Sequence, residues 1–400
     1  MGRAPGLTAP PRLVTPAFLL VSGSTFLSFL ALGALLPVLP RFAEGPLAAG
    51  PVVVGLSVGI ASVSAVVSQP FLGRLADRYG RRPLVVGGPA LLAVATALYV
   101  PADSIVPLLA LRLVAGVAEG TILVGGLSAV SDLAPEERRG EAMSYFTLAL
   151  YGGLALGPLF GELVLEDTNY DRVWLVAAVV AGVGALAAVL TAETRPEGAH
   201  GERGKILHRG ALLPGVVLLS ALLGFGAFNA FIALYALELG LDGGGPLFLL
   251  FSAIVVAVRL FGARLPDVLG AQRAVGIALV VLVAGYLLIA AAPGPALLFL
   301  GVAVYAFGQS LVYPALVTLA VRRAPVAERS SVIGTFSAFI DLAIVGGAGV
   351  LGGVVSFAGY EGAFFAAAAI AALGVVPLTL LSRSIAATPS AGPGASSMNA

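Results

Sequence analysis

The chain has 400 residues, of which 59% are hydrophobic and 11% are charged, and its formal net charge is +1. A soluble domain carries about 25% charged residues, so this composition excludes a soluble protein and predicts one that crosses a membrane many times. The near-neutral charge gives no sign of a nucleic-acid partner, and the absence of cysteine excludes disulfides, thiol nucleophiles and cysteine-based metal sites.

Apolar stretches long enough to cross a bilayer recur along the whole chain. A helix needs about 20 apolar residues to span the hydrocarbon core, so we predict an all-α membrane protein. The first stretch is too long for a signal peptide and has no convincing cleavage site. The twelve predicted spans are residues 15–39, 51–72, 83–100, 105–130, 141–164, 172–191, 211–237, 246–263, 274–292, 295–320, 330–355 and 360–382.

A polar stretch at residues 191–210 is the largest interior break and separates six spans from six. Lys and Arg concentrate on the cytoplasmic side of membrane proteins. With the N-terminus inside, the inner segments hold eighteen of them and the outer segments two, so both ends are predicted to be cytoplasmic. The predicted domains are an N-terminal six-helix bundle (1–191), a cytoplasmic linker (192–210), a C-terminal six-helix bundle (211–384) and a disordered tail (385–400).

The two halves of the chain carry an internal repeat. A constant shift of 190 residues aligns five residues of the first half with identical residues of the second, without a gap. The pairs are Asp77 with Asp267, Gly80 with Gly270, Pro135 with Pro325, Arg139 with Arg329, and Phe146 with Phe336. Parallel repeats related by an axis along the membrane normal occur in one class of transporter, whose site lies at mid-membrane between the halves.

Three sequence motifs resemble those of one transporter superfamily. "GRLADRYGRRP" (73–83) resembles the loop between spans 2 and 3 of the major facilitator superfamily, and "LRLVAGVAEG" (111–120) is similar to its span-4 motif. "GGLALGPLFGE" (152–162) resembles the span-5 motif of the drug/proton antiporter branch, although the family motif ends in Gly where this chain has Glu162. The resemblance implies two six-helix bundles related by a pseudo-two-fold axis along the membrane normal.

The loop at 73–83 is interpreted as a conformational latch, because orienting arginines alone do not explain Asp77. A carboxylate is favourable beside a helix N-terminus. The resemblance implies that Asp77 meets the start of span 11, near 329–332, and that Arg81 pairs with Asp132. Gly73 and Gly80 would permit a close approach and a tight turn. The simpler alternative for Arg78 and Arg82 is that they only orient the chain.

A small-residue stripe on span 5 is predicted to pack tightly against another helix. Gly153, Gly157 and Gly161 recur every four residues, which lets two helix backbones touch. Pro158 lacks a backbone donor and can bend the helix. In the antiporter branch, the resemblance implies that this stripe faces the other half and limits leakage.

Two acids are predicted deep inside the membrane, where a charged side chain costs at least about 2.5–3.5 kcal/mol and usually has a function. Glu119 lies near the centre of span 4, two turns from Arg112, which matches the family motif. Asp341 lies near the centre of span 11 with no basic residue in its span, where a lone carboxyl favours its protonated form. Both are predicted to carry coupling protons. The structural alternatives are mutual neutralisation of Arg112 and Glu119, and a protonated Asp341 hydrogen-bonded between helices.

Further polar residues in the spans are predicted to line a substrate cavity. With Arg112, they are Ser24, Ser28, Asn229, Tyr235, Gln309 and Tyr313. Each such residue is more often a contact between helices than a ligand contact. A wide apolar cavity with two acids suits a hydrophobic or cationic cargo better than a sugar.

The predicted function is secondary active transport, with efflux of small hydrophobic or cationic compounds driven by proton entry through rocker-switch alternating access. The alternative is a proton-coupled uptake symporter for a small metabolite such as a sugar or organic acid, since a fold does not decide function. We expect no enzymatic activity, no cofactor and no metal. The expected partners are a small-molecule substrate, protons and the lipid bilayer, and the chain is expected to be a monomer. The use of 21 Arg against a single Lys suggests a GC-rich prokaryotic genome, and the predicted location is the inner (plasma) membrane.

Overall fold

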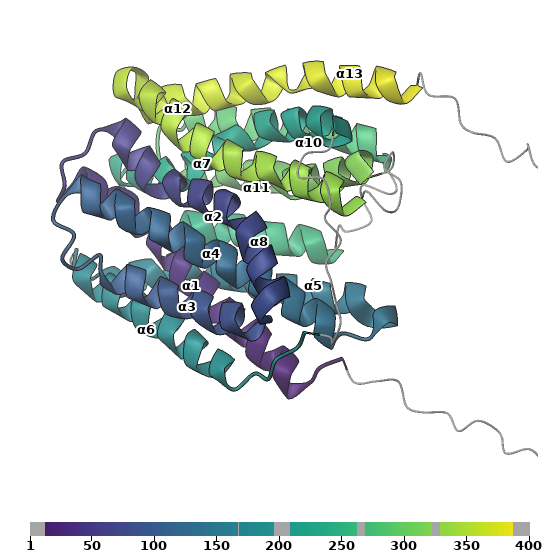
Figure 1. Ribbon diagram of the computed structural model, residues 1–400. Helices are drawn as coiled ribbons and strands as arrows, with labels where there is room; N and C mark the ends of the chain where they lie inside the picture. The colour runs from purple at the N-terminus through teal and green to yellow at the C-terminus, as the bar shows by residue number, and fades with distance from the viewer. Residues whose placement is uncertain (1–12, 167, 196–208, 262–268, 322–328, 387–400) are drawn as a thin grey trace, which may run out of the picture.

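The computed structural model describes residues 13–166, 168–195, 209–261, 269–321 and 329–386, and the regular structure in them is helical. Most of the predicted tail and of the predicted linker lies outside the described residues, and the first two residues of the tail belong to the last helix. The helices of the first half run side by side in one bundle (Figure 1). They are α1 (Pro16–Glu44), α2 (Pro51–Tyr79), α3 (Arg82–Ala97), α4 (Ile105–Leu133), α5 (Arg139–Leu165) and α6 (Tyr170–Val189).

The second half forms a matching bundle beside the first (Figure 1). Its helices are α7 (Leu212–Glu238), α8 (Gly245–Phe261), α10 (Ala271–Ala290), α11 (Pro295–Val321), α12 (Arg329–Leu373) and α13 (Val375–Ala386). Single 3-10 turns precede α5 (Glu136–Arg138) and α7 (Arg209–Ala211). We call the end that carries residues 79–82 and 133–139 the basic end, and the opposite end, with residues 44–51 and 239–245, the far end.

All twelve predicted spans fall largely in helices. Within the described residues, nine helices are long and apolar enough to cross a membrane. Two predicted spans form the shorter apolar helices α3, with 16 residues, and α8, with 17. The last two spans run together in the 45-residue α12, which contains a kink at Gly359 (φ 68°). Helix α12 stops at Leu373 and α13 starts at Val375, so the last predicted span is broken where we expected it to continue.

Local sequence explains where several helices begin. Proline occupies the first turn of α1, α2 and α3, where no backbone N–H is needed for the helix. Thr15 caps α1 by accepting a hydrogen bond from the Phe18 amide at 3.2 Å. Gly80 and Gly270, which the repeat aligns, both have positive φ (97° and 80°) and precede equivalent helices. The repeat therefore specifies the same left-handed turn in both halves.

Glycines allow α1 and α5 to touch along their backbones. A Cβ atom on Gly157 would lie 2.5 Å from the Cα of Gly33, and one on Gly153 or Gly161 would overlap the backbone of α1. Small residues at this spacing are how helices associate where both are surrounded by lipid. The stripe thus lies inside the first bundle, against α1, and not against the other half as the family pattern led us to expect.

The two bundles meet most closely where α2 crosses α12. A Cβ atom on Gly55 would overlap the carbonyl of Ala348, and one on Gly59 would lie 3.1 Å from the Cα of Val345. Helix α7 approaches the other side of α12 in the same way, since a Cβ on Gly226 would overlap the carbonyl of Ile344. The middle of α12 is therefore held between a helix of each half.

Replacing Gly157 with Ala is expected to lower the melting temperature of the detergent-purified protein by several degrees. The new methyl group meets backbone atoms that cannot rotate away, and overpacking of this kind costs about 1–3 kcal/mol. Gly152→Ala is the matched control, because its Cβ would lie an ordinary 3.5 Å from the Phe26 ring. Equal melting temperatures for the two variants would contradict the close packing of α1 on α5.

Candidate functional site

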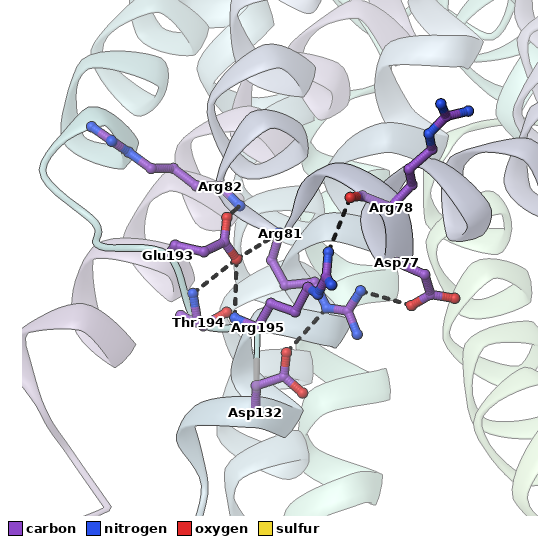
Figure 2. Close-up of polar contacts among 8 residues, drawn as sticks. All are labelled: Asp77, Arg78, Arg81, Arg82, Asp132, Glu193, Thr194 and Arg195. Atoms are coloured by element: carbon purple, nitrogen blue, oxygen red, sulfur yellow. Dashed lines mark hydrogen bonds and ion pairs between the residues drawn. The ribbon is translucent and has the colours of Figure 1, made fainter. Parts of the chain in front are cut away.

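Arg81 is the centre of a polar cluster at the basic end (Figure 2). Its guanidinium donates to the Asp77 carboxylate at 2.8 Å and to the Asp132 carboxylate at 3.0 Å. Asp77 belongs to α2 and Asp132 to the last turn of α4, so Arg81 joins the ends of both helices to the start of α3. The described contacts of this cluster stay within the first bundle. The side chains of residues 329–331, the predicted partner region of Asp77, lie outside the described part of the chain.

Glu193, just after α6, completes the cluster from a segment that we had predicted only as linker. Its carboxylate accepts hydrogen bonds from the backbone amides of Arg81 at 2.7 Å and Arg82 at 3.2 Å, where α3 begins (Figure 2). Helix α3 has no side-chain cap of its own, so Glu193 satisfies its free N–H groups from a distant point in the sequence. Gly80 is required here, because a Cβ at that position would overlap the Glu193 carboxylate.

Two further arginines connect the region around Gly80 to the end of α6 and the segment that follows it. Arg195 donates to the carbonyl of Arg78 at 3.0 Å (Figure 2). Arg82 donates to the carbonyl of Val189 at 3.0 Å. The guanidinium of Arg78 also lies 5.2 Å from the centre of the Tyr79 ring. A Cβ on Gly73 would meet no atom within 4 Å, so the close helix approach expected there is absent among the described residues.

At the far end, polar contacts cross from one bundle to the other. The Glu162 carboxyl, on α5, accepts a hydrogen bond from the Gly244 amide at 2.6 Å, immediately before α8. A Cβ on Gly243 or Gly245 would crowd or overlap the same carboxyl, which explains the run of glycines. The hydroxyl of Tyr360 donates to Glu44 at 3.0 Å, again between halves. The molecule is therefore closed across the halves at its far end.

A cavity of about 160 Å³ lies between α1 and α5 of the first bundle and α7, α8, α11 and α12 of the second. Asn229, Gln309 and Tyr313 are among its lining residues, as expected from the sequence. A second chamber of about 490 Å³ lies toward the basic end between α5 and α8, and shares Tyr151, Val255 and Val256 with the first. The two chambers thus adjoin, on the side away from the Glu162 contact.

Four residues that we expected in the cavity lie elsewhere. Ser28 donates to the carbonyl of Ser24 at 2.8 Å, and both serines are buried inside the first bundle beside Gly184 of α6. Tyr235 is buried against Tyr360 and Phe364. These helices are apolar on all sides, so the sequence gives no signal of which face turns toward the cavity.

Arg112, the fourth residue that we expected in the cavity, joins α4 to α2 by hydrogen bonds. Its guanidinium donates to the carbonyl of Ser57 at 2.7 Å and to that of Val58 at 3.0 Å. One turn later, Gly116 lets the two backbones touch, since a Cβ there would overlap the carbonyl of Ala61. The Arg and the Gly of the span-4 motif therefore act on the same pair of helices.

Glu119 and Asp341 approach each other across the boundary between the bundles. Both side chains are half-buried, and neither forms an ion pair with a basic side chain among the described residues. Asp341 lies within electrostatic range of Glu119, and Glu119 within range of Arg112. The acids are not among the residues that line the 160 Å³ cavity, although Ile340, next to Asp341, is. This corrects our expectation of a cavity containing two acids.

Comparison with known proteins identifies the family to which this arrangement belongs. The sequence profile of the Major Facilitator Superfamily matches residues 21–294 and 244–397. A relative from Salmonella typhimurium, an uncharacterized MFS-type transporter, is 32% identical over 381 residues, covering 91% of this chain and 96% of that protein. The chain belongs to the major facilitator superfamily.

Solved structures of the superfamily share the fold at low identity. A bacterial homologue of the human lysosomal transporter Spinster, solved in an inward-facing and unoccupied conformation, has a TM-score of 0.78 at 14% identity, and the match covers 92% of this chain and 96% of that one. The human organic anion transporter MFSD10 has a TM-score of 0.67 at 21% identity, covering 93% and 100%. The chain is thus a membrane transporter of the major facilitator fold with bacterial relatives.

Glu193→Gln is expected to loosen the segment at 191–195, because a neutral amide accepts the same backbone hydrogen bonds more weakly than a carboxylate. The mobility of a spin label on Ala192→Cys, an exposed position in this cysteine-free chain, reports the change. Glu141→Gln is the control, since that exposed carboxylate interacts with Arg138 and Tyr145 nearby in sequence and is not in contact with the segment at 191–195 among the described interactions. Unchanged mobility in Glu193→Gln would contradict the docking.

The spin label on Ala192→Cys is also expected to show that the mobility of the segment at 191–195 depends on pH. Burial alone would raise the pKa of Glu193, but its four backbone N–H hydrogen bonds outweigh that effect and lower the pKa below its ordinary value of 4.5. The docked segment is therefore at full strength above about pH 4.5 and loosens as the pH falls through the lowered pKa. Loosening that began above pH 5 would contradict this assignment.

Glu162→Ala is expected to open the far end, because the amides before α8 lose their acceptor in the other half. Removing a charge-assisted hydrogen bond costs about 1.5–3 kcal/mol, which is at least a tenfold shift in the ratio of open to closed molecules. Electron paramagnetic resonance distances between labels on Asp103→Cys and Asp242→Cys, both exposed at the far end, should gain a longer component. Glu166→Ala, which breaks only an ion pair within one half, should not change them.

Proposed function

We propose that this transporter exports small hydrophobic or cationic compounds by alternating access, driven by protons that enter through Glu119 and Asp341. The observation that carries the proposal is the approach of these two acids, one from α4 of the first bundle and one from α12 of the second.

The position of Glu119 and Asp341 supports a coupling of proton binding to movement of the bundles, and the reason is electrostatic. Two carboxylates within electrostatic range of each other in apolar surroundings repel each other, so the pair favours a state with at least one proton bound. Because each acid belongs to a different bundle, any movement that separates the bundles changes this repulsion. Proton binding and the relative position of the halves are therefore linked, which is what a proton-driven carrier requires.

The proposal also includes the orientation of the chain in the membrane and the direction of transport. The excess of arginine supports a cytoplasmic location for the basic end, and the proposal puts both chain termini on the same side of a prokaryotic plasma membrane. The described state then faces inward, with the far end closed by Glu162 and the chambers on the cytoplasmic side. Efflux by antiport is supported by the resemblance of residues 152–162 to the antiporter motif. The cluster around Arg81 is proposed to take part in the latch that closes the basic end when the carrier turns outward, with Asp77 meeting the start of the eleventh span.

Uptake of a small polar metabolite by symport remains the second candidate, and one observation favours it. The side chains of Asn229 and Gln309 offer amides to the cavity, and the buried oxygen of Gln309 has no partner among the described residues. A solute held by several hydrogen bonds would support this candidate.

Transport in proteoliposomes with an imposed pH gradient tests the coupling. We expect gradient-driven movement of N-phenyl-1-naphthylamine, an uncharged hydrophobic probe, to fall at least tenfold in Glu119→Gln and in Asp341→Asn, while exchange without a gradient persists. Glu141→Gln, at an exposed carboxylate, should retain coupling. Intact gradient-driven transport in both acid variants would refute the proposal.

A further inference from the structure

The cavity and the acid pair are two separate places in the molecule. Among the described residues that line the 160 Å³ cavity, none is charged. Neutral amides, hydroxyls and apolar side chains form its walls, and the nearest link to the acids is Ile340, whose neighbour along α12 is Asp341. Adjacent residues of a helix point about 100° apart, so one helix can present Ile340 to the cavity and Asp341 to Glu119.

The polar groups of the cavity leave an acceptor for a ligand. The Asn229 side chain donates one N–H to the carbonyl of Phe225 at 2.8 Å, and the Ser310 hydroxyl donates to that of Ala306 at 2.6 Å, so these two donors are used within their own helices. The side-chain oxygen of Gln309 is buried without a hydrogen-bond partner among the described residues. A buried polar atom of this kind destabilises the structure unless a group donates a hydrogen bond to it.

Aromatic rings form one wall of the cavity. Phe225 and Phe251, both in the lining, are stacked with their centres 5.9 Å apart, and Phe228 and Tyr305 pack behind Phe251. The volume of 160 Å³ compares with about 150 Å³ for an engineered cavity that holds benzene. One aromatic ring therefore fits the inner chamber, and the adjoining 490 Å³ chamber has room for the rest of a larger molecule.

We infer that the cargo is an uncharged, ring-bearing molecule with an N–H or O–H group that donates to Gln309, and that it binds apart from the acid pair. A cation in this cavity would lose its hydration without gaining a counter-charge, which is strongly unfavourable. Cargo and protons then do not compete for one carboxylate, and they act on each other through α12. This inference rests on the proposed function and narrows its substrate class by removing the cationic compounds.

Equilibrium binding to the purified full-length chain, without any gradient, tests the substrate class. The probes are N-phenyl-1-naphthylamine, its N-methyl derivative, which lacks the N–H, and tetraphenylphosphonium, which is a cation. We expect the first to bind saturably, the second about tenfold more weakly, and the cation more weakly still. Absence of saturable binding by the first probe, or equal binding of the cation, would overturn the inference.

Variants at Gln309 test the hydrogen bond itself. Gln309→Leu and Gln309→Met should remove the tenfold preference for the N–H probe, and Gln309→Glu should create binding of tetraphenylphosphonium by adding the missing charge. Two apolar variants are used in case one of them fails to fold. Either variant tests the hydrogen bond if its melting temperature equals that of the wild type. A preference for the N–H probe that persists in a folded apolar variant would overturn the role of Gln309.

The acid variants separate this inference from the proposed function. In the double variant Glu119→Gln with Asp341→Asn, N-phenyl-1-naphthylamine should still bind saturably and keep its tenfold preference over the N-methyl derivative, because linkage through α12 acts on both probes alike. Loss of saturable binding or of this preference would show that the acids belong to the cargo site and would overturn the inference. Loss of binding in this variant is distinct from a failure of coupling, which leaves binding intact but makes transport insensitive to the pH gradient.

Discussion

The contact of α12 with α2 and α7 is the constraint on which the site depends. Gly55 and Gly59 let the backbone of α2 reach α12 from one bundle, and Gly226 does the same for α7 from the other. Held between them, α12 can bring Asp341 toward Glu119 while Ile340 reaches the cavity. A larger residue at Gly55 or Gly59 would push the two halves apart, and one at Gly226 would displace α12 within its own bundle.

The two ends of the molecule differ in what their polar groups connect. At the far end, Glu162 and Glu44 form hydrogen bonds with the opposite bundle, so the bundles are fastened to each other. At the basic end, the described contacts of Arg81 and Glu193 hold α2, α3, α4 and the segment after α6 together within one bundle. The described polar contacts therefore join elements of one bundle at the basic end, where the chambers lie, and join the two bundles at the far end.

Much of the fold follows from the sequence because lipid imposes a simple rule of length and hydropathy. The predicted spans lie largely in helices, and the two glycines that the repeat aligns, Gly80 and Gly270, both adopt a positive φ before equivalent helices. The contact between Arg81 and Asp132 agrees with what the family resemblance implied.

The rest could not be predicted, because helices that are apolar on every side carry no periodic signal of their rotation. Ser24 and Tyr235 turned inward to their own bundles for this reason, and Arg112 bonds to a neighbouring helix instead of facing a cavity. Glu193 and Glu162 act through backbone amides of distant segments, which no local pattern marks. The sequence offered only the position of Glu162 in place of the family's Gly.

The central claim is that Glu119 and Asp341 share protons as one pair. Difference infrared spectroscopy of the carboxyl stretch in reconstituted protein tests it directly, because a protonated carboxyl absorbs separately from a carboxylate. At neutral pH we expect a protonated band that either Glu119→Gln or Asp341→Asn shifts or removes. A band that responds to only one of the substitutions, or no protonated carboxyl at neutral pH, would contradict the claim.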